Sequence, residues 1–190
     1  LIAIAARKGC VLQVGHLERF NSAILALEGT LRTPQFIESH RLAPFKERGT
    51  DVNVVLDLMI HDIDLIQSLV GAPIESIDAV GTSVFSAGLD IANARIRYAN
   101  GCVANTTASR VSMKVERKLR LFQDDAYISI DLQQKVLTVV RKPPAGTATV
   151  PGQVVIEERN YEQGDALRLE IEAFLHSIRD GRPPVVSGDD

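Results

Sequence analysis

The sequence has 190 residues, of which 45% are hydrophobic and 24% charged, and its 21 basic and 24 acidic side chains give a formal net charge of −3. This is an ordinary globular composition, whose apolar runs are too short to cross a bilayer and whose basic residues are too scattered to bind nucleic acid. Two cysteines make neither a disulfide framework nor a zinc cluster, so Cys10 and Cys102 are expected to be buried free thiols in a reducing compartment, the cytoplasm.

The first residues predict a short α/β unit. An amphipathic helix covers about residues 1–8 and stops at Gly9, and residues 10–14 form a short buried strand. Such a unit cannot close its own hydrophobic surface, so it should belong to a larger parallel sheet. Because the chain starts within a helix and stops directly after residues 183–186, we expect a fragment at both ends.

Two helices and a strand follow. Asn21 caps a helix that runs to about residue 31, and residues 36–42 form a strand. Residues 54–70 are strongly helical and are closed by Gly71.

Residues 74–161 have a strand-like pattern. Apolar and polar residues alternate over 92–98, and Asn100-Gly101 is a strong two-residue hairpin signal. A meander of three strands follows, at about residues 118–123, 126–132 and 135–141. Residues 143–153, rich in Pro, Gly and Thr, predict a loop at the edge of the sheet.

The last element is a helix that Asp165 caps and Gly181 ends. Its apolar face consists of Leu167, Ile171, Phe174, Leu175 and Ile178. The outline is an α+β fold, in which a short α/β remnant precedes a large, mostly antiparallel sheet covered by helices on one face. The open face could pair with a second subunit, so we expect a homo-oligomer.

Helix 54–70 carries the most informative polar residues. Asp57, His61, Asp64 and Ser68 share one narrow stripe, while most of the remaining circumference is apolar and must be buried. A carboxylate and an imidazole at i and i+4 can hydrogen-bond, which orients the ring for general acid/base catalysis. The same pair could be structural, or the stripe could bind a metal, although His16 would then have to be recruited by folding.

Two further segments hold candidate substrate ligands. His16, Arg19 and Asn21 follow the strand at 10–14, and ligands usually bind at the carboxyl ends of strands in open α/β sheets. Arg41 belongs to a basic segment at 40–48 that could clamp a phosphate or carboxylate. Ordinary capping and solvated surface charge are the alternative for both segments.

Taken together, these motifs resemble the Gfo/Idh/MocA family of NAD(P)-dependent oxidoreductases over essentially the whole chain. Asp57-x-x-x-His61-x-x-Asp64 is similar to the family motif Asp-x-Gly-x-His-x-x-Asp, with Met59 where the family often has Gly. Residues 1–20 look like the end of the family's Rossmann domain. Segments 123–142, 164–174 and 184–188 resemble its late meander, closing helix and the segment after it. The resemblance implies that the family's catalytic Lys would lie upstream of residue 1, and Lys8 and Lys46 are not its equivalent.

The resemblance implies that residues 21–190 form a substrate-binding and oligomerisation domain. The implied reaction transfers hydride between NAD or NADP and a sugar or cyclitol hydroxyl, with His61 as proton acceptor and Asp57 positioning it or contacting the substrate. No glycine-rich dinucleotide fingerprint is present, so the main cofactor site is expected on absent chain, no metal is needed, and residues 1–190 alone should be inactive.

The wording of two segments, 14–21 and 57–64, looks most like the branch of the family that oxidises nucleotide-linked amino sugars. Arg19, Arg41, Lys46 and Arg48 would suit a diphosphate-bearing substrate. Two alternatives stay open. One is a non-catalytic binding or dimerisation module of the same fold, and the other is a metal-dependent hydrolase or lyase.

Overall fold

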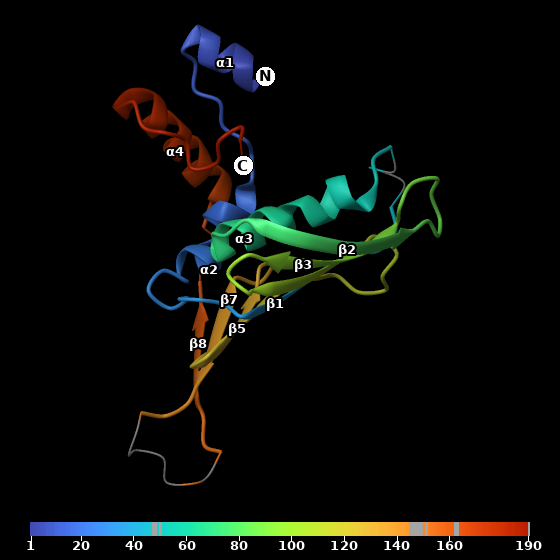
Figure 1. Cartoon of the computed structure of the whole chain (residues 1–190), viewed down its shortest axis with the longest axis vertical. Helices are drawn as coiled ribbons and strands as arrows, with labels where there is room; N and C mark the ends of the chain where they lie inside the picture. Colours follow the sequence, from blue (N-terminus) through green and yellow to red (C-terminus); the bar gives the residue numbers. More distant parts are fainter. Residues whose placement is uncertain (47–48, 50, 145–149, 151, 162–163, 190) are drawn as a thin grey trace.

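The computed structural model describes residues 1–46, 49, 51–144, 150, 152–161 and 164–189, which form one eight-stranded β-sheet with helices beside it (Figure 1). In chain order the strands are β1 (Phe36–Leu42), β2 (Ile74–Thr82), β3 (Ile91–Tyr98), β4 (Val103–Ser109), β5 (Glu116–Gln123), β6 (Ala126–Asp131), β7 (Val136–Arg141) and β8 (Val155–Asn160). The helices are α1 (Ile2–Lys8), α2 (Ser22–Leu25), α3 (Ile60–Val70) and α4 (Ala166–Asp180), with a 3₁₀ turn η1 (Leu17–Phe20) and a π-helical turn η2 (Val55–Met59). The expected α+β class is confirmed.

The sheet has the order β2-β3-β4-β1-β5-β6-β7-β8. Strand β1 lies in the middle and runs parallel to β4, and the other neighbouring pairs of this sheet are antiparallel. The predicted hairpin at Asn100-Gly101 joins β3 to β4, with Gly101 at a φ of 87° that favours glycine. The predicted meander is β5, β6 and β7. The edge loop expected at 143–153 lies partly outside the described residues, at 145–149 and 151.

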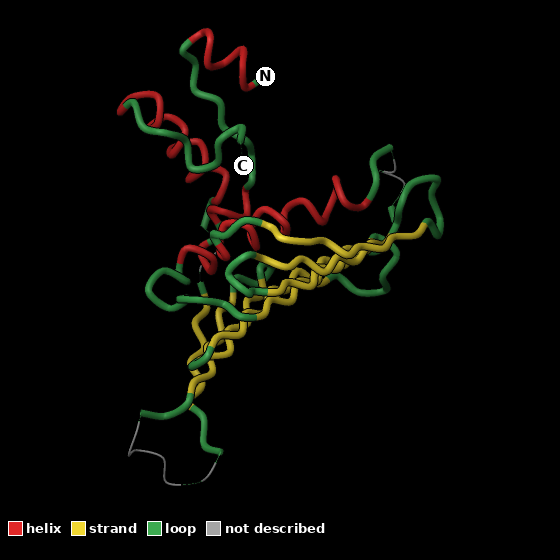
Figure 2. The backbone as a smooth tube through the Cα atoms, viewed as in Figure 1, coloured by secondary structure: helices red, strands yellow, loops and turns green. Residues whose placement is uncertain are grey.

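One face of the sheet carries the core. Alternate side chains of the central strands are buried on it, among them Ile37, Ile96, Leu119, Leu121, Ile128, Ile130, Leu137 and Val139. Helix α3 packs over β1 and β4 on this face, and turn η2 packs over β4. The helices lie on the same side of the sheet, and within the described part of the chain no helix covers the other side (Figure 2). The expected one-sided cover is therefore confirmed.

Residues 10–14 do not form the predicted strand. Within the described part of the chain no strand lies beside them, and a long-range backbone hydrogen bond from this segment joins Val14 N to Val186 O at 3.1 Å. A strand needs a partner to satisfy its backbone groups, so the segment stays irregular. Cys10 is consequently exposed, not buried as expected, whereas Cys102 is buried, and both are free thiols.

The helix after Asn21 is shorter than predicted. The cap forms as expected, because Asn21 Oδ1 accepts a hydrogen bond from Ala23 N at 3.1 Å. The helix nevertheless ends at Leu25, and residues 26–30 are turns that include Gly29 at a left-handed φ of 73°. The helical pattern predicted to residue 31 therefore ends in a series of turns.

The final helix forms as predicted but does not bury the predicted face. Asp165 caps α4 through a bond from Arg168 N (3.0 Å), and Gly181 ends it in the left-handed conformation. Its apolar face is exposed, however, with Leu167 at 56%, Leu175 at 55%, and Ile171 and Ile178 similar. The helix instead buries Glu170 and Ser177 and packs against η1. None of the helices that the structure describes is long and apolar enough to cross a membrane.

A buried ion pair fixes the loops that lead into η2. Arg110 Nε donates to Asp90 Oδ1 at 2.8 Å, and its Nη1 donates to the carbonyls of Gly49 and Val52, each at 2.8 Å. Burial would raise the pKa of Asp90, but hydrogen bonds from the Ser86 hydroxyl and from three backbone amides lower it. The loops at the start of the π-turn are therefore held by charge-assisted bonds.

Candidate active site

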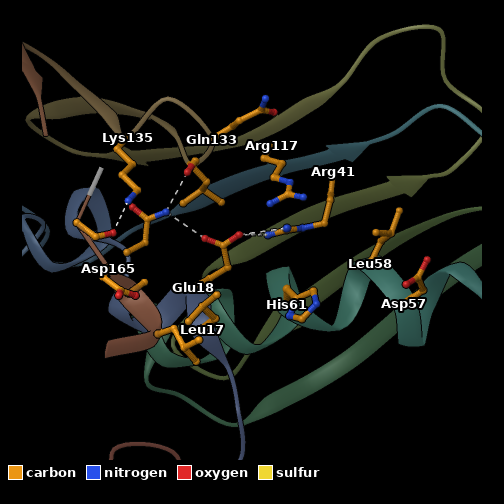
Figure 3. Close-up of a pocket in the computed structure, with 15 residues that line it drawn as sticks. Leu17, Glu18, Arg41, Asp57, Leu58, His61, Arg117, Gln133, Lys135 and Asp165 are labelled. Carbon is orange, nitrogen blue, oxygen red and sulfur yellow. Dashed lines mark hydrogen bonds and ion pairs between the residues drawn. The ribbon is translucent and has the colours of Figure 1, made fainter. Parts of the chain in front are cut away.

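A cleft of about 550 Å³ opens on the helix-covered side of the sheet (Figure 3). Four of the six predicted site residues line it, namely His61 from α3, Asp57 from η2, Arg41 from β1 and Asn21 from the cap of α2. The remaining wall consists of Leu17, Glu18, Leu58, Arg117, Leu132, Gln133, Lys135 and residues 164–167. Segments far apart in sequence thus meet around one histidine.

The π-helical turn decides how Asp57 and His61 are presented. It is closed by a bond from Ile60 N to Val55 O, and the side chain of Asn53 accepts from two of its amides at 3.1 Å. One π-turn inserts an extra residue into the helix, which shifts the side chains before it relative to those after it. Both residues face the cleft, but no hydrogen bond joins them, contrary to the expected i, i+4 contact.

A buried carboxylate–guanidinium–carboxylate network lies beside His61. Arg41 Nε and Nη2 donate to Asp62 Oδ1 at 3.0 and 2.7 Å, and Nη1 and Nη2 donate to Glu18 Oε1 at 3.2 and 3.1 Å. Asn21 Nδ2 continues the network by donating to Glu18 Oε2 (3.1 Å) and to the Leu132 carbonyl (2.9 Å). The predicted substrate ligands Arg41 and Asn21 are therefore already engaged within the protein.

This environment keeps the pKa of His61 below its ordinary value. Burial is the largest cause, and the positive charge of Arg41 lowers the pKa further, while Glu18 and Asp62 act in the opposite direction. A histidine with a lowered pKa is neutral at pH 7 and has a ring nitrogen that can accept a proton. The cleft thus holds one half-buried general-base candidate.

His16 and Arg19 lie outside this cleft, beside a second one of about 540 Å³. Arg19 Nε and Nη2 hold the Asp64 carboxylate in a bidentate pair, each at 2.7 Å. The His16 ring lies edge-on to His61, with 6.2 Å between ring centres. Asp64 therefore turns away from the stripe that it shares with Asp57 and His61.

The stripe does not assemble a metal site. Among the residues that the structure describes, no group of three or more His, Cys, Asp or Glu side chains is arranged to hold an ion.

Two further basic residues were expected to suit a diphosphate-bearing substrate. Of these, Lys46 is exposed, and Arg48 lies outside the described residues.

Sequence reasoning missed four side chains that shape the cleft. Glu18 and Asp62 complete the network, and Arg117 and Lys135 form the opposite wall. No local pattern marks them, because Glu18 and Asp62 lie 23 and 21 residues from Arg41 and meet it only in the folded chain. Arg117 comes to lie opposite Arg41 only through the pairing of β1 with β5 in the folded sheet.

More than half of the chain matches a known protein family. A model described as the GFO/IDH/MocA C-terminal domain matches residues 23–129. UDP-N-acetylglucosamine 3-dehydrogenase of Acidithiobacillus ferrooxidans is 38% identical over 191 aligned positions, which cover 99% of this chain and 60% of that protein.

Solved structures give the same likeness. UDP-N-acetylglucosamine 3-dehydrogenase GnnA from A. ferrooxidans superposes with a TM-score of 0.90 at 39% identity, over 99% of this chain and 60% of that one. A levoglucosan dehydrogenase in complex with NADH and L-sorbose has a TM-score of 0.77 at 16% identity, over 94% and 59%. Aldose-aldose oxidoreductase from Caulobacter crescentus has 0.79 at 17%, over 100% and 60%. The latter two likenesses concern the fold alone, and the chain spans about 60% of the length of these relatives.

Proposed function

The chain belongs to the GFO/IDH/MocA family, as its motifs predict, and we propose that residues 21–190 are the substrate-binding domain of a sugar or nucleotide-sugar dehydrogenase. Residues 1–20 would be the end of a dinucleotide-binding Rossmann domain. The observation that carries the proposal is a neutral, half-buried His61 in a polar cleft, at the position of the family motif. The similarity to UDP-N-acetylglucosamine 3-dehydrogenase makes UDP-N-acetylglucosamine the first substrate to test.

NAD or NADP would be held mainly by residues outside this chain. None of its 13 glycines forms a dinucleotide fingerprint, and the residues that line the cleft suit a polar substrate beside a base. The greater length of the relatives is in accord with a separate cofactor domain. When bound, the nicotinamide supplies the acceptor for the hydride of the carbon that is oxidised.

In the proposed mechanism His61 accepts the proton of the substrate hydroxyl while the carbonyl forms. Burial and Arg41 favour the neutral ring before the reaction. Glu18 and Asp62 keep the Arg41 charge in place, and their negative charge favours the imidazolium that results. Asp57, which has no bond to His61, would accept a hydrogen bond from another hydroxyl of the sugar.

The test is turnover by the complete protein with His61 replaced by alanine. We expect kcat to fall by about 10²-fold or more, because general base catalysis typically contributes that much. His176→Ala is the matched control, since this histidine is exposed on α4. A non-catalytic binding module would show no turnover before or after the change, and an unaltered kcat would refute His61 as the base.

Residues 1–190 alone should not turn over. Because the main cofactor site is proposed to lie on residues outside this chain, reduction of NAD or NADP should be absent with any sugar. Detectable reduction by the purified 190-residue protein would contradict the proposed division of the site.

We further propose that the open face of the sheet joins two copies of the chain. Phe36, Phe122 and Tyr127 form an aromatic row on that face, with ring centres 5.7 and 5.0 Å apart, and no described helix covers them. Light scattering should give an oligomeric mass that Phe122→Glu reduces. A native protein that stays monomeric at high concentration would contradict this interface.

A further inference from the structure

Two arginines stand directly opposite each other at the floor of the cleft. In the antiparallel pairing of β1 with β5, Arg41 is the partner of Arg117, two positions beyond the pair formed by Ser39 and Leu119. Both side chains therefore point to the helix-covered face and both line the cleft (Figure 3). Like charges directly opposite each other across two strands destabilise a sheet unless an anion compensates them.

The protein compensates only one of the two charges. Arg41 is 4% exposed and is held by Glu18 and Asp62. Within the described residues no ion pair or side-chain hydrogen bond engages Arg117, which is exposed toward the cleft. The second guanidinium thus keeps a fork of donors that no side chain of the described residues uses.

A lysine that lines the same cleft has an unusual backbone conformation. Lys135 ends the turn between β6 and β7 and, with a φ of 57°, is a non-glycine residue in the left-handed region. Asp131 Oδ1 fixes this turn by accepting from the amides of Gln133 and Gln134, and Leu132 N bonds to the Arg117 carbonyl at 2.9 Å. A position that favours glycine or asparagine carries instead a lysine that lines the cleft.

We propose that Arg117 and Lys135 form an anion subsite that binds the diphosphate of a nucleotide-linked substrate whose sugar reaches His61. The inference rests on the proposed function and names its specificity-determining residues. The planar guanidinium suits bidentate binding of phosphate, and Lys135 adds a point charge, although one of its protons already goes to the Gly164 carbonyl at 2.8 Å. Arg19 and Arg41, expected in this role, are occupied by carboxylates of the protein.

Titration calorimetry of the 190-residue chain with UDP-N-acetylglucosamine, UDP, N-acetylglucosamine and pyrophosphate tests the subsite. Arg117→Ala should lower the affinity for UDP-N-acetylglucosamine and for UDP by about 10- to 100-fold and leave the affinity for N-acetylglucosamine unchanged. Arg117→Lys should restore part of the affinity, because it keeps the charge without the fork. Arg179→Ala, exposed near the end of α4 and away from the cleft, is the control and should change nothing.

These binding measurements test the anion subsite independently of the proposed dehydrogenase activity. Equal affinity of native and Arg117→Ala protein for UDP-N-acetylglucosamine would overturn the subsite and leave the proposed function intact. If UDP-N-acetylglucosamine bound no more tightly than N-acetylglucosamine, the subsite would likewise be overturned and the proposed function would be left intact. Absence of binding by all four compounds would overturn the subsite, and the turnover assay of His61→Ala would then decide the function alone.

Discussion

Replacing Arg41 with methionine should destabilise the protein and raise the pKa of His61. The side chain is 4% exposed and donates four hydrogen bonds, two each to Asp62 and Glu18. Without it, two carboxylates that are 3% and 15% exposed lose their cation. Removing one partner of such a buried network costs about 3–5 kcal/mol of the free energy of unfolding, which for a chain of this size lowers Tm by roughly 6–20 °C.

The effect on His61 has the same cause and a defined sign. The native pKa lies below 6.5 because of burial and of the Arg41 charge, so the variant pKa should move upward. At a pH between the pKa of His61 in the folded protein and 6.5, this histidine binds more protons in the unfolded chain than in the folded protein. The contribution of His61 to the stability of the native protein is therefore fully present above pH 6.5 and is lost as the pH falls below that value. The stability difference between native and variant should therefore narrow as the pH falls.

NMR titration of the His61 ring and urea unfolding at pH 7 measure the two effects. Arg179→Met, exposed near the end of α4, is the control and should change the free energy of unfolding by no more than about 0.5 kcal/mol. The triple variant Glu18→Gln, Arg41→Met, Asp62→Asn should recover much of the loss, because it leaves no unpaired buried charge. A loss below about 1 kcal/mol for Arg41→Met, or an unmoved His61 pKa, would refute the reasoning.

Three further predictions concern single side chains. Asp57→Asn should raise KM in the complete protein without moving the pKa of His61 in an NMR titration, because no hydrogen bond joins the two, and a clear shift would show coupling. Tyr98→Phe should raise stability by about 1 kcal/mol in thermal unfolding, because the buried hydroxyl has no partner among the described residues, and a loss of stability would contradict this. Arg110→Met should cost about 3–5 kcal/mol in urea unfolding, because it leaves Asp90 buried without its cation, and a change below 1 kcal/mol would count against the clamp.

Signals between neighbours in sequence predicted the structure well. Asn21 and Asp165 cap their helices, Gly9, Gly71 and Gly181 end theirs, and Asn100-Gly101 makes its hairpin. Each of these features depends on a few adjacent residues, so its physical cause is present in the local sequence. The alternation of apolar residues over 92–98 likewise located β3.

Periodicity could identify an apolar face but not what covers it. The last helix was predicted to have one apolar face, made of Leu167, Ile171, Phe174, Leu175 and Ile178. Four of these side chains are exposed, Phe174 is half-buried, and α4 packs through its other side. The segment at 10–14 likewise has no neighbouring strand among the described residues, so the predicted strand does not form. Burial depends on which other segments come close, and amphipathicity carries no information about them.

The sequence by itself determined the family, the α+β class and the candidacy of His61 and Asp57. The tertiary structure decided which charges surround them: Glu18 and Asp62 neutralise Arg41, Asp64 pairs with Arg19, and Arg117 is left facing the cleft. Those partners come from segments 21 to 45 residues apart. Motifs record the residues that chemistry requires, whereas electrostatic surroundings arise only when strand pairing and a π-turn bring distant side chains together.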